Sequence, residues 1–452
     1  MSRSNGRAVG GALVMFAALA CGRAESRPAA ASDTAGTPAT MGASGAARSS
    51  SGAPSVVLGD ARAVSGTTEV GTAPTFAVSD AGTGVVAWVS APGGGSDGRL
   101  YVQVGDSAPH ELRDPLGPVV GYGEAPPKLV FGPDGSLSAL YVIGKIIPGQ
   151  KWPGSALRYV RSRDGGRTWD APVTVTDDST VFGDHNFQSL HVGPDGAVYV
   201  SWLDGRGGKS AAYVTHSTDG GATWAANRRI EPRGEACPCC RTAVATANDG
   251  TLYVAWRKLF PGSVRDIVVA RSTDRGATWS EPVRAHADDW KFDACPDAGP
   301  ALAVDGAGRV HVAWWTGLEG KAGVYYARSD DGARSFGAPT PLGVAQFSRP
   351  AHVQLALGGD STVVATWDDG TRQLPQVVVR VSRDGGASFG PREAVSASGR
   401  TAAFPVVALR RQEMTLAWSE KTEAPPAHHS HGGGALPKVG NTQVMLRRGT
   451  VE

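Results

Sequence analysis

An eight-residue motif recurs five times between residues 162 and 389, and it constrains the fold of this chain more than any other feature. Its fullest form is Ser-Thr-Asp-Gly-Gly-Ala-Thr-Trp, and the last residue is Trp or Phe in every copy. The copies begin at Ser162, Ser217, Ser272, Ser329 and Ser382, so successive starts are 55, 55, 57 and 53 residues apart. Self-similarity at a nearly constant period of this size is typical of a repeat architecture.

Each copy has the composition of a tight turn between two strands. A β-rich run precedes the motif, and another short strand signal follows it within a few residues. Asp bonds to nearby backbone amides, and Gly adopts positive φ without steric strain. The closing aromatic ring is then able to fold over the turn and be buried between neighbouring sheets. We therefore predict a structural rather than a catalytic role for the five motif aspartates, Asp164, Asp219, Asp274, Asp331 and Asp384.

The composition and the strand pattern predict an all-β chain. The 452 residues include 61 glycines and 30 prolines, with short strand-like runs and no sustained helical periodicity. A pair of strands joined by a turn is recognisable seven times, usually with a Trp at the end of the second strand. The pairs span residues 75–89, 127–143, 187–202, 243–256, 301–315, 351–367 and 404–418.

Counting these pairs predicts a seven-bladed β-propeller of four-stranded blades. The last unit stops after a third strand at residues 443–447, so it lacks a fourth strand of its own. Residues 55–63 are predicted to supply that strand from the N-terminus and thereby to close the ring. A six-bladed propeller remains the alternative.

The octapeptides resemble the Asp-box of bacterial neuraminidase (BNR) repeats, which occur in the sialidase superfamily and in its non-enzymatic relatives. The resemblance covers roughly residues 60–450. It implies a propeller whose Asp-boxes lie away from the active site. It also implies a glycoside hydrolase that removes terminal sialic acids. Such enzymes use three arginines to hold the carboxylate, an Asp acid/base, and a Tyr nucleophile assisted by a Glu. True sialidases have six blades, which is the source of the six-bladed alternative.

Propeller geometry places the residues that precede each first strand around one mouth of the central channel, on the face without Asp-boxes. Arginine suits the binding of a carboxylate because its planar fork bonds it bidentately. Two features of the sialidases are missing, since there is no Phe-Arg-Ile-Pro motif near the first blade and no tyrosine after Tyr326. The catalytic candidates implied by the resemblance are the arginines Arg241, Arg349 and Arg400, the acid/base Asp184, and the nucleophile pair Tyr122 and Glu124.

Four cysteines fall at matched positions before two adjacent blades. Three lie in Glu-Ala-Cys-Pro-Cys-Cys-Arg, as Cys237, Cys239 and Cys240, and Cys295 lies in Asp-Ala-Cys-Pro-Asp. Cysteines oxidise outside the cytoplasm, so disulfides are the favoured interpretation, with Cys239 or Cys240 bonded to Cys295 because a vicinal pair would be strained.

The alternative for these cysteines is a soft-metal site for copper or zinc. His185 or His352 would complete the set of thiolate ligands. Three further histidines, His428, His429 and His431, form a cluster that we interpret as a flexible solvated loop, with metal binding as the alternative. No motif requires a cofactor.

The N-terminal segment predicts export and anchoring. Residues 1–22 have the form of a signal peptide, with arginines before an apolar run, and Cys21 stands where a bacterial lipoprotein carries its lipid. Residues 23–55 are rich in Ala, Ser, Gly, Thr and Pro and are predicted to be a disordered tether, so the propeller comprises residues 56–452. We expect an extracytoplasmic protein that is lipid-anchored to a bacterial membrane, with secretion or a periplasmic location as the alternative.

Three functional hypotheses follow. The first is a sialidase-like exoenzyme, the second a non-catalytic propeller that presents its channel mouth to a glycan or a protein, and the third a cysteine- and histidine-based metal-handling protein. The expected partner is a glycan or glycoconjugate. The net charge is +2, and Lys and Arg are interleaved with Asp and Glu, so the sequence has no basic stripe and nucleic acid is not an expected partner.

Overall fold

The computed structural model describes residues 55–66, 70–91, 97–150, 152–344, 350–359, 361–371, 374–421 and 442–452. Every regular element in these ranges is a β-strand, and none of these residues belongs to a helix that is long and apolar enough to cross a membrane. Several predictions concern residues outside the described ranges. They are the signal segment 1–22 with Cys21, the tether up to residue 54, Arg349, and the cluster of His428, His429 and His431.

The strands form seven antiparallel sheets. In each sheet four main strands lie side by side, each hydrogen-bonded to the next. Blade 1 consists of β2 (Val70–Val78), β3 (Gly84–Ala91), β4 (Arg99–Val104) and β5 (His110–Leu112). Blade 2 consists of β6 (Lys128–Phe131), β7 (Leu137–Lys145), β8 (Gly154–Ser162) and β9 (Val173–Thr174). Blade 3 consists of β10 (His185–Val192), β11 (Val198–Asp204), β12 (Ala211–Ser217) and β13 (Arg228–Arg229).

Blade 4 carries one additional short strand. It consists of β15 (Ala243–Thr246), β16 (Leu252–Phe260), β17 (Val264–Ser272) and β18 (Val283–Arg284), and β14 (Glu235–Ala236) pairs with the far end of β16. Blade 5 consists of β19 (Ala301–Val304), β20 (Val310–Thr316), β21 (Gly323–Ser329) and β22 (Thr340–Val344). Blade 6 consists of β23 (Gln354–Gly358), β24 (Thr362–Asp369), β25 (Gln376–Ser382) and β26 (Glu393–Ala394).

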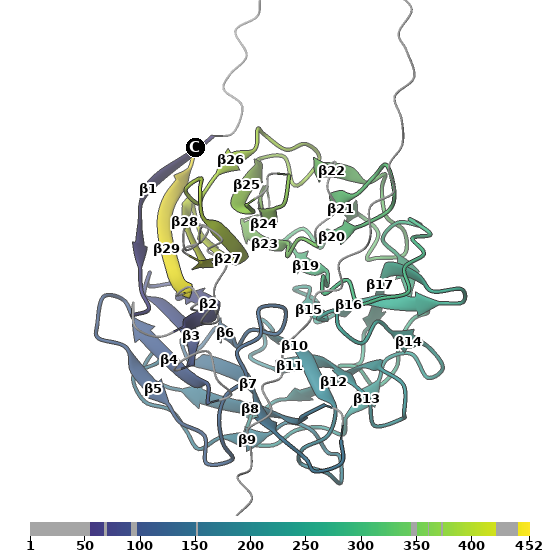
Figure 1. The fold of residues 1–452 in the computed structure, drawn as a ribbon. Helices are drawn as coiled ribbons and strands as arrows, with labels where there is room; N and C mark the ends of the chain where they lie inside the picture. The colour runs from purple at the N-terminus through teal and green to yellow at the C-terminus, as the bar shows by residue number, and fades with distance from the viewer. Residues whose placement is uncertain are drawn as a thin grey trace, which may run out of the picture. The chain divides into compact units, whose positions relative to one another are not determined.

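The seven sheets close into a ring, as Figure 1 shows. The first strands of successive blades contact one another in the order β2, β6, β10, β15, β19, β23 and β27, and β2 also contacts the strands of blade 7. The seven-bladed prediction is therefore confirmed, and the six-bladed alternative is wrong. A fully buried Trp from the second strand of five blades, in each case with less than 2% of its surface exposed, fills the space between sheets (Trp202, Trp256, Trp314, Trp367 and Trp418).

Blade 7 is assembled from both ends of the described chain. It consists of β27 (Thr401–Arg410), β28 (Glu413–Lys421), β29 (Thr442–Val451) and, at its outer edge, β1 (Val56–Ala63). Strand β1 runs antiparallel to β29, with Val56 opposite Val451. Figure 1 shows the two strands side by side at the point where the colours of the two ends meet. The N-terminal strand predicted to close the ring is thus confirmed.

The Asp-box turns share one geometry. In the first copy, Ser162 donates from its hydroxyl to Asp164 (2.8 Å), and the Gly166 amide donates back to the Ser162 oxygen (2.7 Å). The other Asp164 oxygen accepts from the Thr168 hydroxyl (2.6 Å). These hydrogen bonds hold the pKa of Asp164 far below its usual range, and the other four copies repeat the arrangement. Each motif carboxylate is therefore engaged inside its own turn.

Candidate functional site

The segments that precede blades 2, 4, 5 and 6 meet around one buried carboxylate, Glu124. Its side chain accepts hydrogen bonds from the backbone amides of Arg241 (3.1 Å) and Gly299 (2.5 Å), and it also pairs with the Arg241 guanidinium. Glu124 is fully buried. The chain topology puts these segments on the face opposite the Asp-boxes, so the loop before β6 reaches across the channel mouth to the far blades.

Arg241 is held on every side by the protein. Besides Glu124, its guanidinium donates to the Val353 carbonyl (2.6 Å), and only 4% of the residue is exposed. A side chain at Gly299 would overlap the Arg241 backbone, which explains a glycine at that position. The guanidinium fork is thus satisfied by the protein's own groups and is not directed at solvent.

His352 lies beside this ion pair and has acceptors at both ring nitrogens. Its Nδ1 is 2.6 Å from the Asp368 carboxylate, and its Nε2 donates to the Asp297 carbonyl (3.0 Å). Burial lowers the pKa of His352, but the negative charges of Asp368 and Glu124 outweigh burial and leave that pKa raised. Two acceptors and a raised pKa both favour the doubly protonated imidazolium. The Phe404 ring packs against it, with centroids 4.2 Å apart.

Tyr122 is the aromatic residue that this assembly presents at its surface. The residue is 38% exposed, and its ring meets Phe187 edge to face, with centroids 6.1 Å apart. Its hydroxyl interacts with the Asp297 carboxyl. Burial, and then the charge of Glu124, raise the pKa of Asp297, although the hydrogen bond with Tyr122 opposes this effect. The mouth therefore combines an exposed aromatic ring with a partly buried carboxyl group whose pKa is raised.

Lys128 is the first residue of β6, and it interacts electrostatically with both Glu124 and Arg241. Burial and the positive charge of Arg241 lower its pKa to about 7, while Glu124 partly opposes them. Asp368 and Lys128 were not among the sequence candidates. A lysine at the start of an apolar first strand, and an aspartate directly after Trp367, were the signals that could have identified them.

Three cysteines cluster at the edge of this assembly because of a local turn. The Cys240 amide donates to the Cys237 carbonyl (3.4 Å), with Pro238 at the position where a proline favours such a turn. The Sγ atom of Cys237 lies 3.3 Å from that of Cys240 and 3.6 Å from that of Cys239. Hydrogen bonds from these two thiols, with the charges of Arg257 and Arg265, lower the pKa of Cys237. The three thiols thus form one compact, buried group of sulfur atoms.

Two buried arginines stand next to the cysteines. Arg265 donates to Cys237 Sγ (2.9 Å) and to the Phe292 carbonyl (2.5 Å). Arg257 is 1% exposed, and it donates only to backbone carbonyls, those of Arg265, Ala298 and Trp315. Neither arginine pairs with a carboxylate among the residues that the structure describes. Arg257 and Arg265 were missed from the sequence, although an arginine directly after Trp256 in an apolar strand is unusual.

Cys295 comes from the next blade and is exposed, beside Cys239. All four described cysteines are free, so the structure contains none of the disulfides considered from the sequence. The three ligand atoms of Cys237, Cys239 and Cys240 lie within 4.8 Å of one another. In the described ranges this is the only such group of three or more His, Cys, Asp or Glu side chains.

The remaining candidates lie apart from these two clusters. His185 contacts Asp204 (3.1 Å) and Asp178 (3.5 Å), so neither it nor His352 joins the cysteine group. Asp184 is exposed beside Gly205, and Arg400 pairs with Glu420 of its own blade (2.8 Å). The structure therefore unites Tyr122, Glu124, Arg241 and His352, and it joins the cysteines to one another. It does not bring Asp184, His185 or Arg400 to the same point.

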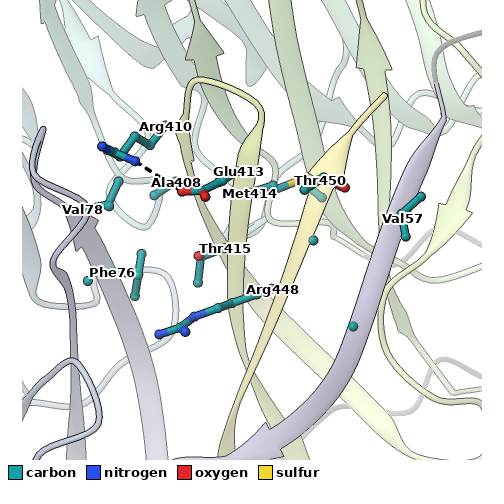
Figure 2. A pocket seen from close by; sticks show the side chains of 14 residues that line it. Val57, Phe76, Val78, Ala408, Arg410, Glu413, Met414, Thr415, Arg448 and Thr450 are labelled. Atoms are coloured by element: carbon teal, nitrogen blue, oxygen red, sulfur yellow. Dashed lines mark hydrogen bonds and ion pairs between the residues drawn. The ribbon is translucent and has the colours of Figure 1, made fainter.

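Two cavities lie on the side of the ring that carries the first-to-second strand turns. A funnel of about 850 Å³ enters the channel between blades 1, 2, 3, 6 and 7, lined by Leu129, Phe131, Leu357 and Leu409 among others. A groove of about 430 Å³ runs along the seam of blades 7 and 1. Figure 2 shows Arg410, ion-paired with Glu413, and Arg448 in its wall, with Phe76 opposite.

The comparisons with known proteins agree with this architecture. Residues 121–292 match the family model described as BNR repeat-like domain. No curated protein sequence matches the chain. Polysaccharide lyase Uly1 has a similar structure, with 12% identity, 87% of this chain and 99% of that chain covered, and a TM-score of 0.53. A PL25 ulvan lyase bound to -[GlcA(1-4)Rha3S]- is also similar in structure. It has 13% identity, 79% of this chain and 93% of that chain are covered, and the TM-score is 0.51.

A similar fold also occurs in a protein of unknown function from Dyadobacter fermentans, with 14% identity, coverage of 87% of this chain and 99% of that chain, and a TM-score of 0.51. At these identities the similarity concerns the fold. The resemblance indicated by the octapeptides is confirmed, because residues 121–292 of this seven-bladed propeller match the family model described as BNR repeat-like domain.

Proposed function

We propose that this propeller engages a polysaccharide at its box-free mouth. The observation that carries the proposal is the convergence of segments from different blades beneath an exposed aromatic ring, Tyr122, with the Asp297 carboxyl at its hydroxyl end. A sugar presents a face of C–H groups and an edge of hydroxyls. Tyr122 supplies an apolar face together with a polar tip, and Asp297 supplies an acceptor, which is the combination that such a ligand requires.

The rigid base under Tyr122 also supports this proposal. Glu124, Arg241 and His352 are buried and hydrogen-bonded to one another's segments, so the mouth is largely ordered before a ligand arrives. Preorganisation lowers the entropy lost on binding. The similar folds include polysaccharide lyases, one of them bound to a glucuronate-containing oligosaccharide. Uronate-containing polysaccharides are therefore the first class to test.

The experiment is a binding screen over acidic and neutral polysaccharides, followed by calorimetric titration of the best ligand. We expect Tyr122→Ala to weaken binding by more than about tenfold, because truncation of a central aromatic anchor typically removes about 2 kcal/mol or more. Tyr325→Ala is the matched control, since Tyr325 lies on β21, the third strand of blade 5, where its ring stacks on Trp314 and its hydroxyl donates to the Lys321 carbonyl. Absence of binding to any polysaccharide, or equal binding by Tyr122→Ala, would refute the proposal.

Cleavage of the bound glycan is a second candidate function, favoured by the raised pKa of Asp297. A raised pKa favours the protonated form of a carboxyl group, and that form can protonate a leaving oxygen. Reducing-end release and the absorbance of unsaturated uronates would detect hydrolysis and elimination respectively. Asp297→Asn should abolish either activity while Tyr122-dependent binding persists. Binding without any product would leave the non-catalytic form of the proposal.

Sialidase activity is the finer proposal that the resemblance implies, and a fluorogenic sialoside tests it directly. It requires three arginines that are free to hold a carboxylate. In this chain Arg241 already binds Glu124 and Val353, and Arg400 binds Glu420. We therefore expect no sialoside turnover. Turnover that is lost in Arg241→Ala but kept in Arg62→Ala, whose partner Asp106 is on the surface, would contradict this expectation.

We further propose that the protein acts outside the cytoplasm, attached through a lipid on Cys21. Metabolic labelling with a fatty-acid analogue, compared between the wild type and Cys21→Ser, tests this placement. Label in the wild type and none in Cys21→Ser is the expected result. An unlabelled protein released into the medium would instead support secretion.

A further inference from the structure

We propose that Cys237, Cys239 and Cys240 form a three-thiolate binding site for copper(I). The cysteine cluster adjoins the proposed glycan site, since Cys239 interacts with Asp297, but the inference does not depend on the glycan proposal. Three features carry it: the spacing of the sulfurs, the two arginines beside them that pair with no carboxylate, and the exposed fourth cysteine.

The spacing of the sulfurs suits a single ion. Metal–thiolate bonds of about 2.3 Å in a trigonal plane place the sulfurs about 4.0 Å apart. The Sγ atom of Cys237 already lies 3.3 Å from that of Cys240 and 3.6 Å from that of Cys239. Small rotations about the side-chain bonds would therefore open the cluster around an ion. The turn at Pro238 and the bond from the Cys237 amide to the Arg257 carbonyl (2.8 Å) hold the three residues in place.

The charge of the surroundings suits a thiolate–copper complex. Three thiolates and one Cu⁺ carry a net charge of −2. Arg265 and Arg257 are buried or nearly so, and no described carboxylate pairs with either. A buried cation without a counter-charge is expensive. An anionic copper–thiolate centre would supply the negative charge that these two guanidinium groups lack.

The donor set favours copper(I) over zinc(II). The three ligands are sulfur, the donor that selects soft ions, and the group contains no histidine or carboxylate. Structural zinc takes four ligands in a tetrahedron. Among the residues that the structure describes, Cys295 is the one further thiol nearby, and it lies outside the compact group and is exposed. Its place beside Cys239 fits an entry ligand that receives an incoming ion and passes it to the three buried sulfurs.

The experiment uses full-length protein in a Cys21→Ser background, reduced, kept anaerobic and without a histidine tag. Copper(I) is titrated in competition with a chromophoric copper(I) chelator such as bicinchoninate. We expect one equivalent of copper(I) to be retained, with the near-ultraviolet absorption of copper–thiolate bonds. Cys237→Ser and Cys240→Ser should each weaken retention at least about a hundredfold. Cys295→Ser should keep the stoichiometry and slow the uptake.

Two further measurements make the result independent of how well the cysteine variants fold. Thiol alkylation of the wild type should show Cys237, Cys239 and Cys240 protected by copper(I) and Cys295 still reactive. A variant with His428, His429 and His431 replaced by alanine should retain copper(I) equally well. Failure to compete with the chelator would overturn the proposal. So would preferential binding of zinc(II) with all four cysteines protected, or disulfides among the three cysteines in protein isolated under non-reducing conditions.

Discussion

Glu124 and Arg241 form a buried ion pair between two segments that belong to blades 2 and 4, which are not neighbours in the ring. Neither side chain is more than 4% exposed. Most contacts in a repeat array join adjacent units. This pair instead links two blades across the channel mouth. Hydrogen bonds of Glu124 with Gly299 and of Arg241 with Val353 connect the pair to blades 5 and 6 as well.

Glu124→Ala should destabilise the protein by about 3–5 kcal/mol, because it leaves the Arg241 guanidinium buried without its counter-charge. Urea unfolding followed by tryptophan fluorescence measures the change. Arg62→Ala is the control. It breaks a surface pair with Asp106 and should change stability by less than about 1 kcal/mol. A double replacement of Glu124 and Arg241 by methionine should recover part of the loss, and equal losses in the single and double variants would argue against a paired charge.

Gly221→Ala should disrupt the second Asp-box turn. Gly221 has φ of 91°, and an added Cβ would overlap the Tyr159 ring, against which Trp224 packs with centroids 5.1 Å apart. We expect the left-handed conformation to lower the free energy of unfolding by about 1–2 kcal/mol. Overpacking should lower it by about 1–3 kcal/mol more. Gly196→Ala separates the two effects, since Gly196 has φ of 79° and open space around it. Comparable losses at both glycines would contradict the proposed packing role of the turn.

Removal of β1 should open the ring. A variant that lacks residues 1–63 loses the strand that covers β29, so blade 7 is left with an unpaired edge and with less cover for its core, to which Val56 and Leu58 contribute. We expect a lower unfolding temperature and concentration-dependent association, measured by calorimetry and light scattering. The control lacks residues 1–54 and keeps β1. Equal stability of the two variants would show that β1 is dispensable.

His352 should contribute stability that falls as the pH rises. Its folded-state pKa is raised above the unfolded value of about 6.5, so the contribution is complete below that pH. It is then lost as the pH rises through the folded-state pKa. Lys128 titrates in the same range, with its pKa lowered to about 7, so the informative quantity is the difference in unfolding free energy between wild type and His352→Gln. That difference should shrink between pH 6 and pH 9, and a pH-independent difference would refute the imidazolium assignment.

The fold was predictable from the sequence because its signals are local and repeated. The octapeptide beginning at Ser217 and the turn pairs ending at Trp202 and Trp256 each specify a strand and its neighbour without reference to distant residues. The strand that closes the ring was predictable because the last unit of the sequence has only three strands. Such a blade leaves an unpaired edge, which residues 56–63 can fill. The additional strand β14 gave no such signal, because it is two residues long.

The site was predictable only in part, because its contacts join residues far apart in the chain. Topology placed Glu124 and Arg241 at one mouth, but it could not show that they would neutralise each other rather than face a ligand. The cysteine cluster follows from the turn at Pro238, whereas the approach of Arg265 depends on how β17 packs beside that turn. His185 was predicted wrongly to join the cysteines. It does stand at the start of a blade, as the other candidates do, but its ring contacts Asp204 instead.

The pairing of β1 with β29 sets the order in which this molecule can be completed. Val56 and Val451 are separated by 395 positions along the chain, so the earliest strand to be synthesised has to wait for the latest one. At about 5–20 residues per second, that interval is roughly 20–80 s. Throughout it, β1 lacks the strand with which it pairs. The ring therefore cannot close until the last strand of the chain is available.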